Sequence, residues 1–165
     1  MKVTPAAAGD IAALVELGRV CHSESRFAHL TYDAERVSAR FTQMIEKAKA
    51  GTFFVAARPA PGQISGLMIG VIDEYFFCDQ RVASSIFFLV HPLHRGGLSA
   101  SKMVLAFRAW AQARGAAEMY VGVASGVAIQ RTGRFLSKLN LTLSGGNYSA
   151  WLAAPSSGPC AAGAH

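Results

Sequence analysis

The stretch Phe87–Val104 brings together residue types that bind phosphate groups. A hydrophobic strand ends at Val90-His91-Pro92, a basic residue and two glycines follow, and a helix then begins. Glycines in such a turn let the backbone approach a ligand, and the first N–H groups of a helix point outward without partners. The pattern predicts a pyrophosphate-binding loop, with Arg95 adding a charge-assisted contact, made of Arg95, Gly96, Gly97, Leu98, Ser99 and Ala100.

Positive charge is concentrated around this loop. The chain has a formal net charge of +6, from 16 basic and 10 acidic residues. Residues 81–138 hold eight Lys and Arg side chains against one acid, Glu118, so that segment carries +7 and the remainder −1. Such a segment favours an anionic partner. A phosphorylated cofactor and a nucleic acid both fit this charge, and so does a basic face that only contacts solvent.

The composition is that of one folded domain. Of the 165 residues, 52% are apolar and 16% charged, which excludes a disordered chain. The longest apolar stretches have about nine residues, whereas a membrane-spanning helix needs roughly 20. No secretory signal is evident at the N-terminus, so we expect a cytoplasmic protein without membrane association. The spacing of Cys21, Cys78 and Cys160 predicts no disulfide framework, and no residue pattern predicts a metal site.

Hydrophobic periodicity predicts an α+β domain. The expected order is β-α-α-β-β-β-α-β-α-β-β, with about four helices flanking a mixed, mostly antiparallel sheet of six to seven strands. Strand, helix and strand from 82 to 123 imply one parallel pair. We place the domain at residues 1–154 and a flexible tail at 155–165. The expected strands are Lys2–Pro5, 52–57, 64–77, 82–90, 118–124, 141–144 and 148–153, of which 52–57, 64–77 and 82–90 form an antiparallel meander. Asp10 and Asp33 are expected to cap the first two helices, and the other two helices span 98–113 and 126–139.

This element order and the loop residues resemble the GNAT family of N-acyltransferases. That family's signature is V-x-P-x-x-R/Q-x-x-G-x-G/A, and Val90, Pro92, Arg95 and Ala100 match it without a gap. Leu98 stands where the family has a glycine, and a one-residue deletion would bring Gly97 there instead. The resemblance in organisation covers residues 2–153, and the motif itself about 15 residues.

The resemblance implies a GNAT fold and transfer of an acyl group from acyl-CoA, usually acetyl-CoA, to a primary amine. Backbone groups near Leu89 and Val90 would hold the pantetheine and thioester, and N–H groups of residues 95–100 the pyrophosphate. Lys138 matches the family's pattern on the later helix and is assigned to the cofactor site. On the same helix, Arg131 and Arg134 either add positive field near CoA or form a solvated face.

The family's usual catalytic groups are absent. Leu136 replaces the tyrosine that often acts as general acid, and leucine cannot protonate a leaving thiolate. No carboxylate occurs on the strand before V-x-P, so the candidate bases are Glu74, Asp73 and His91. Each of them also has an interpretation without a catalytic role. The two acids would then lie at a solvent-facing strand end, and His91 would be a structural residue.

Three functional hypotheses follow. The first is an N-acetyltransferase with an unidentified amine acceptor, bound near the loop 22–32 by analogy with the family. The second is a non-catalytic acyl-CoA-binding or regulatory protein of the same fold, which the missing tyrosine and carboxylate favour. The third, nucleic-acid binding, is disfavoured because the aromatic residues follow core periods. The apolar segment Tyr148–Leu152 is also a candidate edge for pairing with a second subunit in a homodimer.

Overall fold

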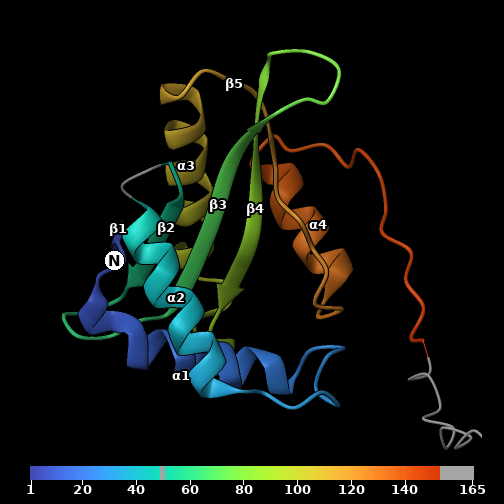
Figure 1. The fold of residues 1–165 in the computed structure, drawn as a ribbon. Helices are drawn as coiled ribbons and strands as arrows, with labels where there is room; N and C mark the ends of the chain where they lie inside the picture. The colour runs from blue at the N-terminus through green and yellow to red at the C-terminus, as the bar shows by residue number, and fades with distance from the viewer. Residues whose placement is uncertain (49–50, 153–165) are drawn as a thin grey trace, which may run out of the picture.

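One mixed sheet lies between helices on its two faces (Figure 1). The computed structural model describes residues 1–48 and 51–152, and these form five strands, four α-helices and two short 3-10 turns. No helix in these residues is both long and apolar enough to cross a membrane. In chain order the elements are β1 (Lys2–Pro5), η1 (Ala8–Asp10), α1 (Ile11–Ser23), α2 (Ala34–Ala48), β2 (Phe53–Arg58), β3 (Gly66–Glu74), β4 (Arg81–Val90), η2 (Pro92–His94), α3 (Leu98–Ala113), β5 (Ala116–Tyr120) and α4 (Ile129–Lys138).

The strands lie in the order β1-β2-β3-β4-β5. Neighbours among the first four strands are antiparallel, which confirms the predicted meander, and β4 pairs with β5 in parallel through α3. The register between β3 and β4 shifts once: Ile69 pairs with Phe87 and Gly70 with Ser85, so Ile86 is a bulge. A bulge bends its strand and increases the local twist.

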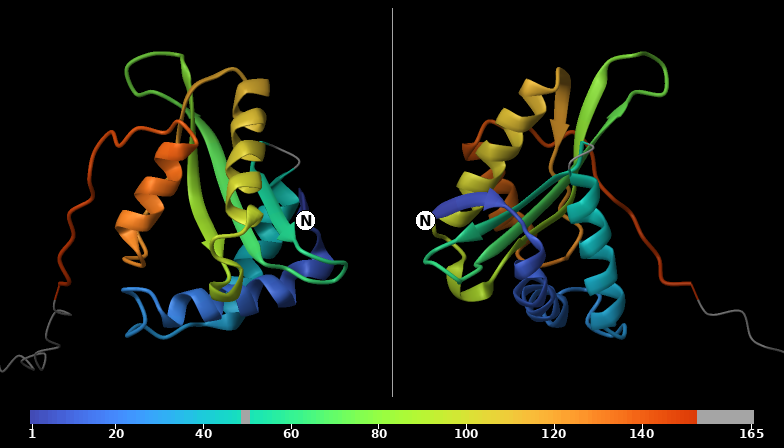
Figure 2. Two further views of the ribbon diagram at one scale, coloured as in Figure 1. Left: turned by 180° about the vertical axis from the view of Figure 1, so that it is seen from behind. Right: turned by 60° about the vertical axis from the view of Figure 1, so that its left-hand side comes forward.

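Successive side chains of a strand point to opposite faces of the sheet, so each face has its own hydrophobic core. On one face, Phe54 and Ala56 of β2 and Leu67 and Ile69 of β3 pack with Leu14, Leu17, Cys21 and Phe41 of α1 and α2. On the other, Phe53, Val55, Ala57 and Met68 pack with Met103, Phe107 and Ala111 of α3. The two helical layers are visible in the turned views of Figure 2.

An aspartate precedes each of the first two helices, and only the second aspartate caps its helix. Asp33 Oδ1 accepts from Arg36 N at 2.9 Å, which confirms Asp33 as the cap of α2. Asp10 precedes α1 but its carboxylate does not cap that helix. It accepts from Ala7 N at 2.8 Å and from the Arg58 guanidinium of β2, and this guanidinium lowers the pKa of Asp10.

The end of α4 forms a Schellman motif. Asn140 takes the left-handed conformation with φ of 58°. Its N–H bonds to the Ser137 carbonyl at 3.0 Å, and the Leu141 N–H reaches the Leu136 carbonyl at 3.1 Å. The chain therefore turns at Asn140, and the left view of Figure 2 shows the following segment running away from the sheet.

The expectation of two further strands is wrong over the described residues. Residues 141–152 form no strand, so the predicted strand at 141–144 is missing, and so is the predicted strand at 148–153 up to residue 152; residue 153 lies outside the described residues. The sheet has five strands rather than six or seven. Strand β5 also ends at Tyr120 instead of Ala124. A strand requires a hydrogen-bonded neighbour, and neither segment has one.

Gly70 makes room for the aromatic centre of the second core. A Cβ atom built at this position overlaps the Phe107 ring, which is fully buried and packs beside Phe53 and Trp110. By contrast, a Cβ at Gly9 has nothing within 4 Å. The close approach of β3 and α3 therefore depends on the missing side chain at Gly70.

We predict that Gly70→Ala lowers the free energy of unfolding by about 1–3 kcal/mol, because one added methyl group overpacks the core. Urea unfolding followed by circular dichroism measures this. The control Gly9→Ala should change stability by less than about 0.5 kcal/mol. Equal stabilities of the two variants would contradict the packing of Phe107 against β3.

Candidate functional site

Strand β4 separates from β5 halfway along its length. The two strands pair only from Arg81 to Ser84, and one further link follows, in which Gly122 N donates to Ser85 Oγ at 3.0 Å. Past the bulge at Ile86, β4 has no strand neighbour on this side among residues 1–48 and 51–152. The helix α4 lies beside this part of β4, and Phe135 stacks on Phe88 with ring centroids 6.3 Å apart (Figure 1). The second half of β4 therefore has a backbone edge that no strand covers.

The phosphate-binding loop predicted from the sequence follows this free edge. After η2, Gly96 has a positive φ of 86°, and Gly97 is the N-cap of α3 without any side-chain cap. The first N–H groups of α3, from Leu98 onward, consequently lack intrahelical acceptors. The Ser99 side chain is buried and bonds to Ser65 Oγ at 2.9 Å, so Ser99 faces the core. The ligand-binding groups that this loop offers are backbone N–H groups.

Arg131 of α4 lies directly over the loop. A Cβ atom on Gly96 would be 3.1 Å from Arg131 Nη2. Beside it is an open hollow of about 450 Å³ lined by Gly126, Ala128, Ile129, Gln130, Arg131 and Arg134. The Arg131 guanidinium thus borders both the loop and this hollow, and Arg134 lines the hollow as well. This arrangement gives the loop a positive environment suited to phosphate groups.

The Arg95 side chain binds other residues of the protein. Its Nε donates to the Val90 carbonyl at 3.2 Å, and its Nη1 donates to Glu24 Oε2 at 3.0 Å, while Nη2 contacts Glu24 Oε1. Both side chains of this ion pair are 31% exposed. Glu24 is the residue that ends α1. One guanidinium therefore joins the end of β4 to the start of the α1–α2 loop and remains partly accessible at the edge of the phosphate-binding loop.

Two more side chains lie at the end of β4. The Cys21 thiol contacts the Val90 carbonyl at 3.7 Å, and burial raises the pKa of this thiol, although the charge of Arg95 opposes the shift. Burial of Cys21 therefore favours the thiol over the thiolate. His91 begins η2, its Nδ1 accepts from Leu93 N at 3.3 Å, and its ring lies 5.8 Å from that of His94.

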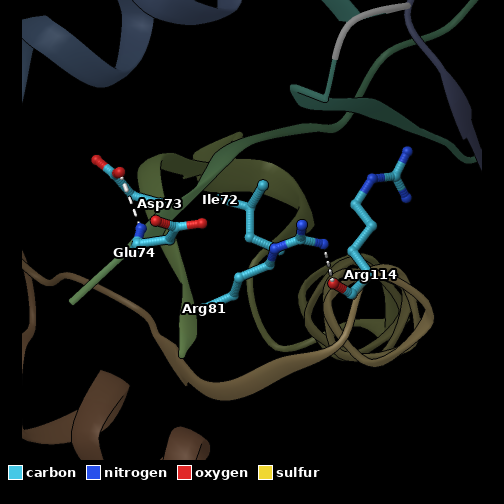
Figure 3. A pocket seen from close by; sticks show the side chains of 5 residues that line it. All are labelled: Ile72, Asp73, Glu74, Arg81 and Arg114. Carbon is cyan, nitrogen blue, oxygen red and sulfur yellow. Dashed lines mark hydrogen bonds between the residues drawn. The ribbon is translucent and has the colours of Figure 1, made fainter. Parts of the chain in front are cut away.

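The two predicted carboxylates lie at the opposite end of β4. Asp73 pairs with Val82 and Glu74 with Arg81, whereas Val90 pairs with Gly66. Glu74 and Gly66 are eight positions apart on β3, which is about 26 Å of strand. Figure 3 shows both acids beside Arg81, whose Nη1 donates to the Arg114 carbonyl at 3.1 Å in an open hollow. The structure does not bring Asp73 and Glu74 together with the loop.

The two residues of α4 that the sequence suggested for the cofactor site lie at opposite ends of that helix. Arg131 is in the first turn of α4, and Lys138 is in its last turn, about 10 Å further along the helix axis. Leu136 is buried, and its backbone carbonyl accepts the hydrogen bond from Leu141 N that ends the helix. Within residues 1–48 and 51–152, no cluster of His, Cys, Asp and Glu has the geometry of a metal site.

The fold gives Arg131 and Glu24 neighbours that the sequence did not indicate. The sequence left Arg131 equally suited to a solvated face, and it gave no reason to link Glu24 with Arg95. Their partners lie 35 and 71 positions away in the chain, at Gly96 and Arg95 respectively. The concentration of positive charge in residues 81–138 was the signal that pointed to Arg131.

Solved structures of other proteins have a similar architecture. No family model and no curated protein matches the chain. Among solved structures, an acetyltransferase of Trypanosoma brucei is similar over 92% of this chain and 99% of its own, at 16% identity and a TM-score of 0.68. Glucosamine-6-phosphate N-acetyltransferase from Arabidopsis thaliana covers 92% and 98%, at 13% identity and 0.70. A transcriptional regulator from Bacillus halodurans covers 92% and 99%, at 16% and 0.70.

At these identities the similarity establishes the architecture. It extends over 92% of this chain in each of these three structures. The chain therefore has the fold of the GNAT N-acetyltransferases.

Proposed function

We propose that this protein is an acyl-CoA-dependent N-acyltransferase that moves an acyl group, acetyl in the first instance, onto a primary amine. The observation that carries the proposal is the uncapped N-terminus of α3, which follows the free edge of β4 and lies under Arg131. Phosphate groups need this combination of unpaired N–H groups and positive charge.

The proposed binding site runs from the loop along β4. N–H groups of residues 95–100 and the Arg131 guanidinium would hold the pyrophosphate. The free edge at Leu89 and Val90 would receive the pantetheine, which supplies the acyl group as a thioester. We retain Arg95 as a cofactor residue through its partly accessible guanidinium, and Lys138 as a more distant positive charge on α4.

Acyl transfer requires an unprotonated amine. The amine nitrogen forms a bond to the acyl carbon, the carbon–sulfur bond breaks with its electrons going to sulfur, and a base takes the proton from nitrogen. Of the three bases predicted from the sequence, His91 is at the end of β4 next to the loop, whereas Asp73 and Glu74 are about 26 Å away along the strand. We therefore assign the proton to His91.

A non-catalytic acyl-CoA-binding protein is the second candidate. The observation in its favour is the buried Leu136, which offers no proton to a leaving thiolate at the position of the family's tyrosine. Both candidates require cofactor binding, and only the first requires turnover with an amine.

Calorimetric titration with CoA and with acetyl-CoA tests the shared requirement. We expect micromolar binding to one site per chain; absence of binding to both would overturn the two candidates together. Release of free thiol from acetyl-CoA in the presence of a panel of primary amines then separates them. Binding without thiol release would favour the non-catalytic protein.

We predict that Arg131→Glu weakens CoA binding by about tenfold or more, because one lost charge-assisted hydrogen bond is worth about 1.5–3 kcal/mol. Calorimetry measures the change in Kd. The control is Arg40→Glu, which makes the same charge reversal on the exposed face of α2, and it should leave Kd nearly unchanged. Equal weakening by both variants would reduce the effect to net charge and remove Arg131 from the site.

We also predict that Glu24→Gln tightens CoA binding by roughly fivefold, corresponding to about 1 kcal/mol. The substitution removes a negative charge from the edge of the loop and leaves the Arg95 guanidinium uncompensated for a phosphate. Glu16→Gln, on the same helix but paired with Arg19, is the matched control and should bind as the wild type does. Weaker binding of Glu24→Gln would show instead that Glu24 holds Arg95 in its binding position.

A further inference from the structure

An exposed carboxylate on β5 has two hydroxyl donors and no basic partner. The hydroxyl groups of Tyr75 and Tyr120 both donate to Glu118 Oε2, the second at 2.9 Å. Glu118 is the only acid in residues 81–138, a segment with eight Lys and Arg side chains. Nevertheless, no basic side chain of the described residues forms an ion pair with it. Its negative charge is therefore left without a cation in this part of the chain.

The sheet explains why the nearest arginine does not reach this carboxylate. Asp73, Val82 and Glu118 pair in one row across β3, β4 and β5, so their side chains share a face. Arg81 precedes Val82 on β4, and its side chain consequently points to the opposite face. There its Nη1 donates to the Arg114 carbonyl at 3.1 Å. The backbone thus directs this guanidinium away from Glu118.

The Tyr75 side chain reaches Glu118 from the β3–β4 turn. Its N–H donates to the Gln80 carbonyl at 3.0 Å, which closes the turn, and Figure 1 shows this turn extending past the end of the sheet. Because Tyr75 follows β3 and Glu118 lies on β5, the phenol must cross β4. Val82, in the row below this crossing, is only 9% exposed. The Phe77 ring stacks on the Tyr75 ring with centroids 5.3 Å apart, so two aromatic rings stand beside the carboxylate.

The hydrogen bonds within this cluster leave it with acceptors only. Both phenol protons are donated to Oε2, so the two hydroxyl oxygens keep lone pairs but have no proton for a ligand. Glu118 Oε1 accepts no hydrogen bond from the described residues. The hydrogen bond from Tyr75, and then that from Tyr120, lowers the pKa of Glu118, so its carboxylate is ionised at neutral pH. A ligand that fits must therefore bring hydrogen-bond donors and positive charge.

We propose that Glu118, Tyr75 and Tyr120 form a binding site for a primary alkylammonium group. An ammonium has a compact charge and three N–H donors in different directions, so one group can use Oε1 and a phenol oxygen together. The stacked rings of Tyr75 and Phe77 add a cation–π surface. A guanidinium fits less well, because its planar fork binds both oxygens of a carboxylate and Oε2 already accepts two hydrogen bonds.

This site is separate from the proposed base. Val82 and Val90 pair with Asp73 and Gly66, which are seven positions apart on β3, so about 23 Å of strand separates the Glu118 row from the end of β4 that His91 follows. An ammonium held by an ionised carboxylate also keeps its proton and is not a nucleophile. The site therefore holds a cationic group other than the amine that is acylated, and its occupation requires no cofactor.

Nuclear magnetic resonance titration of the full chain without cofactor tests the proposal. The probes are n-butylammonium and n-butylguanidinium at constant ionic strength, followed at the backbone amides of residues 116–122. We expect saturable shifts with n-butylammonium, at a Kd of about 1–10 mM. Binding of n-butylguanidinium should be about threefold weaker or more, since its fork cannot use Oε2.

Three variants locate the binding group. Glu118→Gln should abolish the saturable shifts. Tyr120→Phe keeps the carboxylate but removes one phenol oxygen, and it should weaken binding about two- to fivefold. Asp79→Asn removes one negative charge from the exposed β3–β4 turn, and as the matched control it should bind n-butylammonium as the wild type does. Far-ultraviolet circular dichroism of each variant confirms that it is folded.

A further probe identifies the source of the ammonium. A short peptide, blocked at both ends and with one lysine between glycines, presents the same group as a side chain. Tighter binding of this peptide than of n-butylammonium would assign the ligand to a polypeptide, and equal or weaker binding would assign it to a free amine.

Three results would overturn the proposal. They are the absence of saturable shifts with either ammonium probe, binding of n-butylguanidinium as tight as that of n-butylammonium, and equal weakening by Glu118→Gln and Asp79→Asn. Ammonium binding together with a failure to bind CoA would contradict the proposed function and leave this site in place.

Discussion

The bulge at Ile86 is the feature on which the candidate site depends. The extra residue lies just past the last β4–β5 pair at Ser84 and Tyr120, and β4 bends there. It also changes which residues face α3: Ala83 does so before the bulge, and Phe88 and Val90 do so after it. A continuous parallel pair would have used the backbone groups of residues 87–90 for the sheet. Because β4 leaves β5, this side of residues 87–89 has no strand neighbour among the described residues, and the Val90 carbonyl accepts from Arg95 Nε instead, where the chain enters the loop.

The loop is held in place by charge as well as by its backbone. Arg95 connects the Val90 carbonyl to Glu24, and so ties the last residue of β4 to the end of α1. Three of its N–H groups serve this purpose, whereas Arg131, from the other side, approaches Gly96 across the surface. The two arginines have different tasks in consequence. Arg95 fixes the position of the loop and contributes field, and Arg131 is placed to contact an anion.

Local patterns were enough to predict most of the fold. The β2–β4 meander, the parallel return through α3 and the cap at Asp33 depend on neighbours in sequence, and all three were predicted correctly. Pairing at a sheet edge is not local. The alternation in residues 141–152 is genuine strand patterning, but a strand also needs a partner, and the turn at Asn140 takes the segment away from one.

The site was predictable to a smaller extent for the same reason. The loop at Gly96 and Gly97 follows from consecutive residues, whereas the contacts of Arg131 and Glu24 cross from other elements. The position of Glu74 could have been inferred. A short turn between Glu74 and Arg81 places that acid at the start of β4, and Val90 is nine residues further on, at the strand's other end.

Leucine at position 136 limits the rate of the proposed reaction more than it limits its feasibility. A thiol has a pKa of about 8.5, so at neutral pH a leaving thiolate is disfavoured relative to the thiol by only about 2 kcal/mol. An amine leaving group would need a general acid, but a thiolate can depart and take its proton from solvent. Deprotonation of the acceptor is the larger demand, because an alkylammonium has a pKa near 10.4. A base at the end of β4 is therefore worth more to this chain than an acid on α4, and the geometry gives that end of the strand His91.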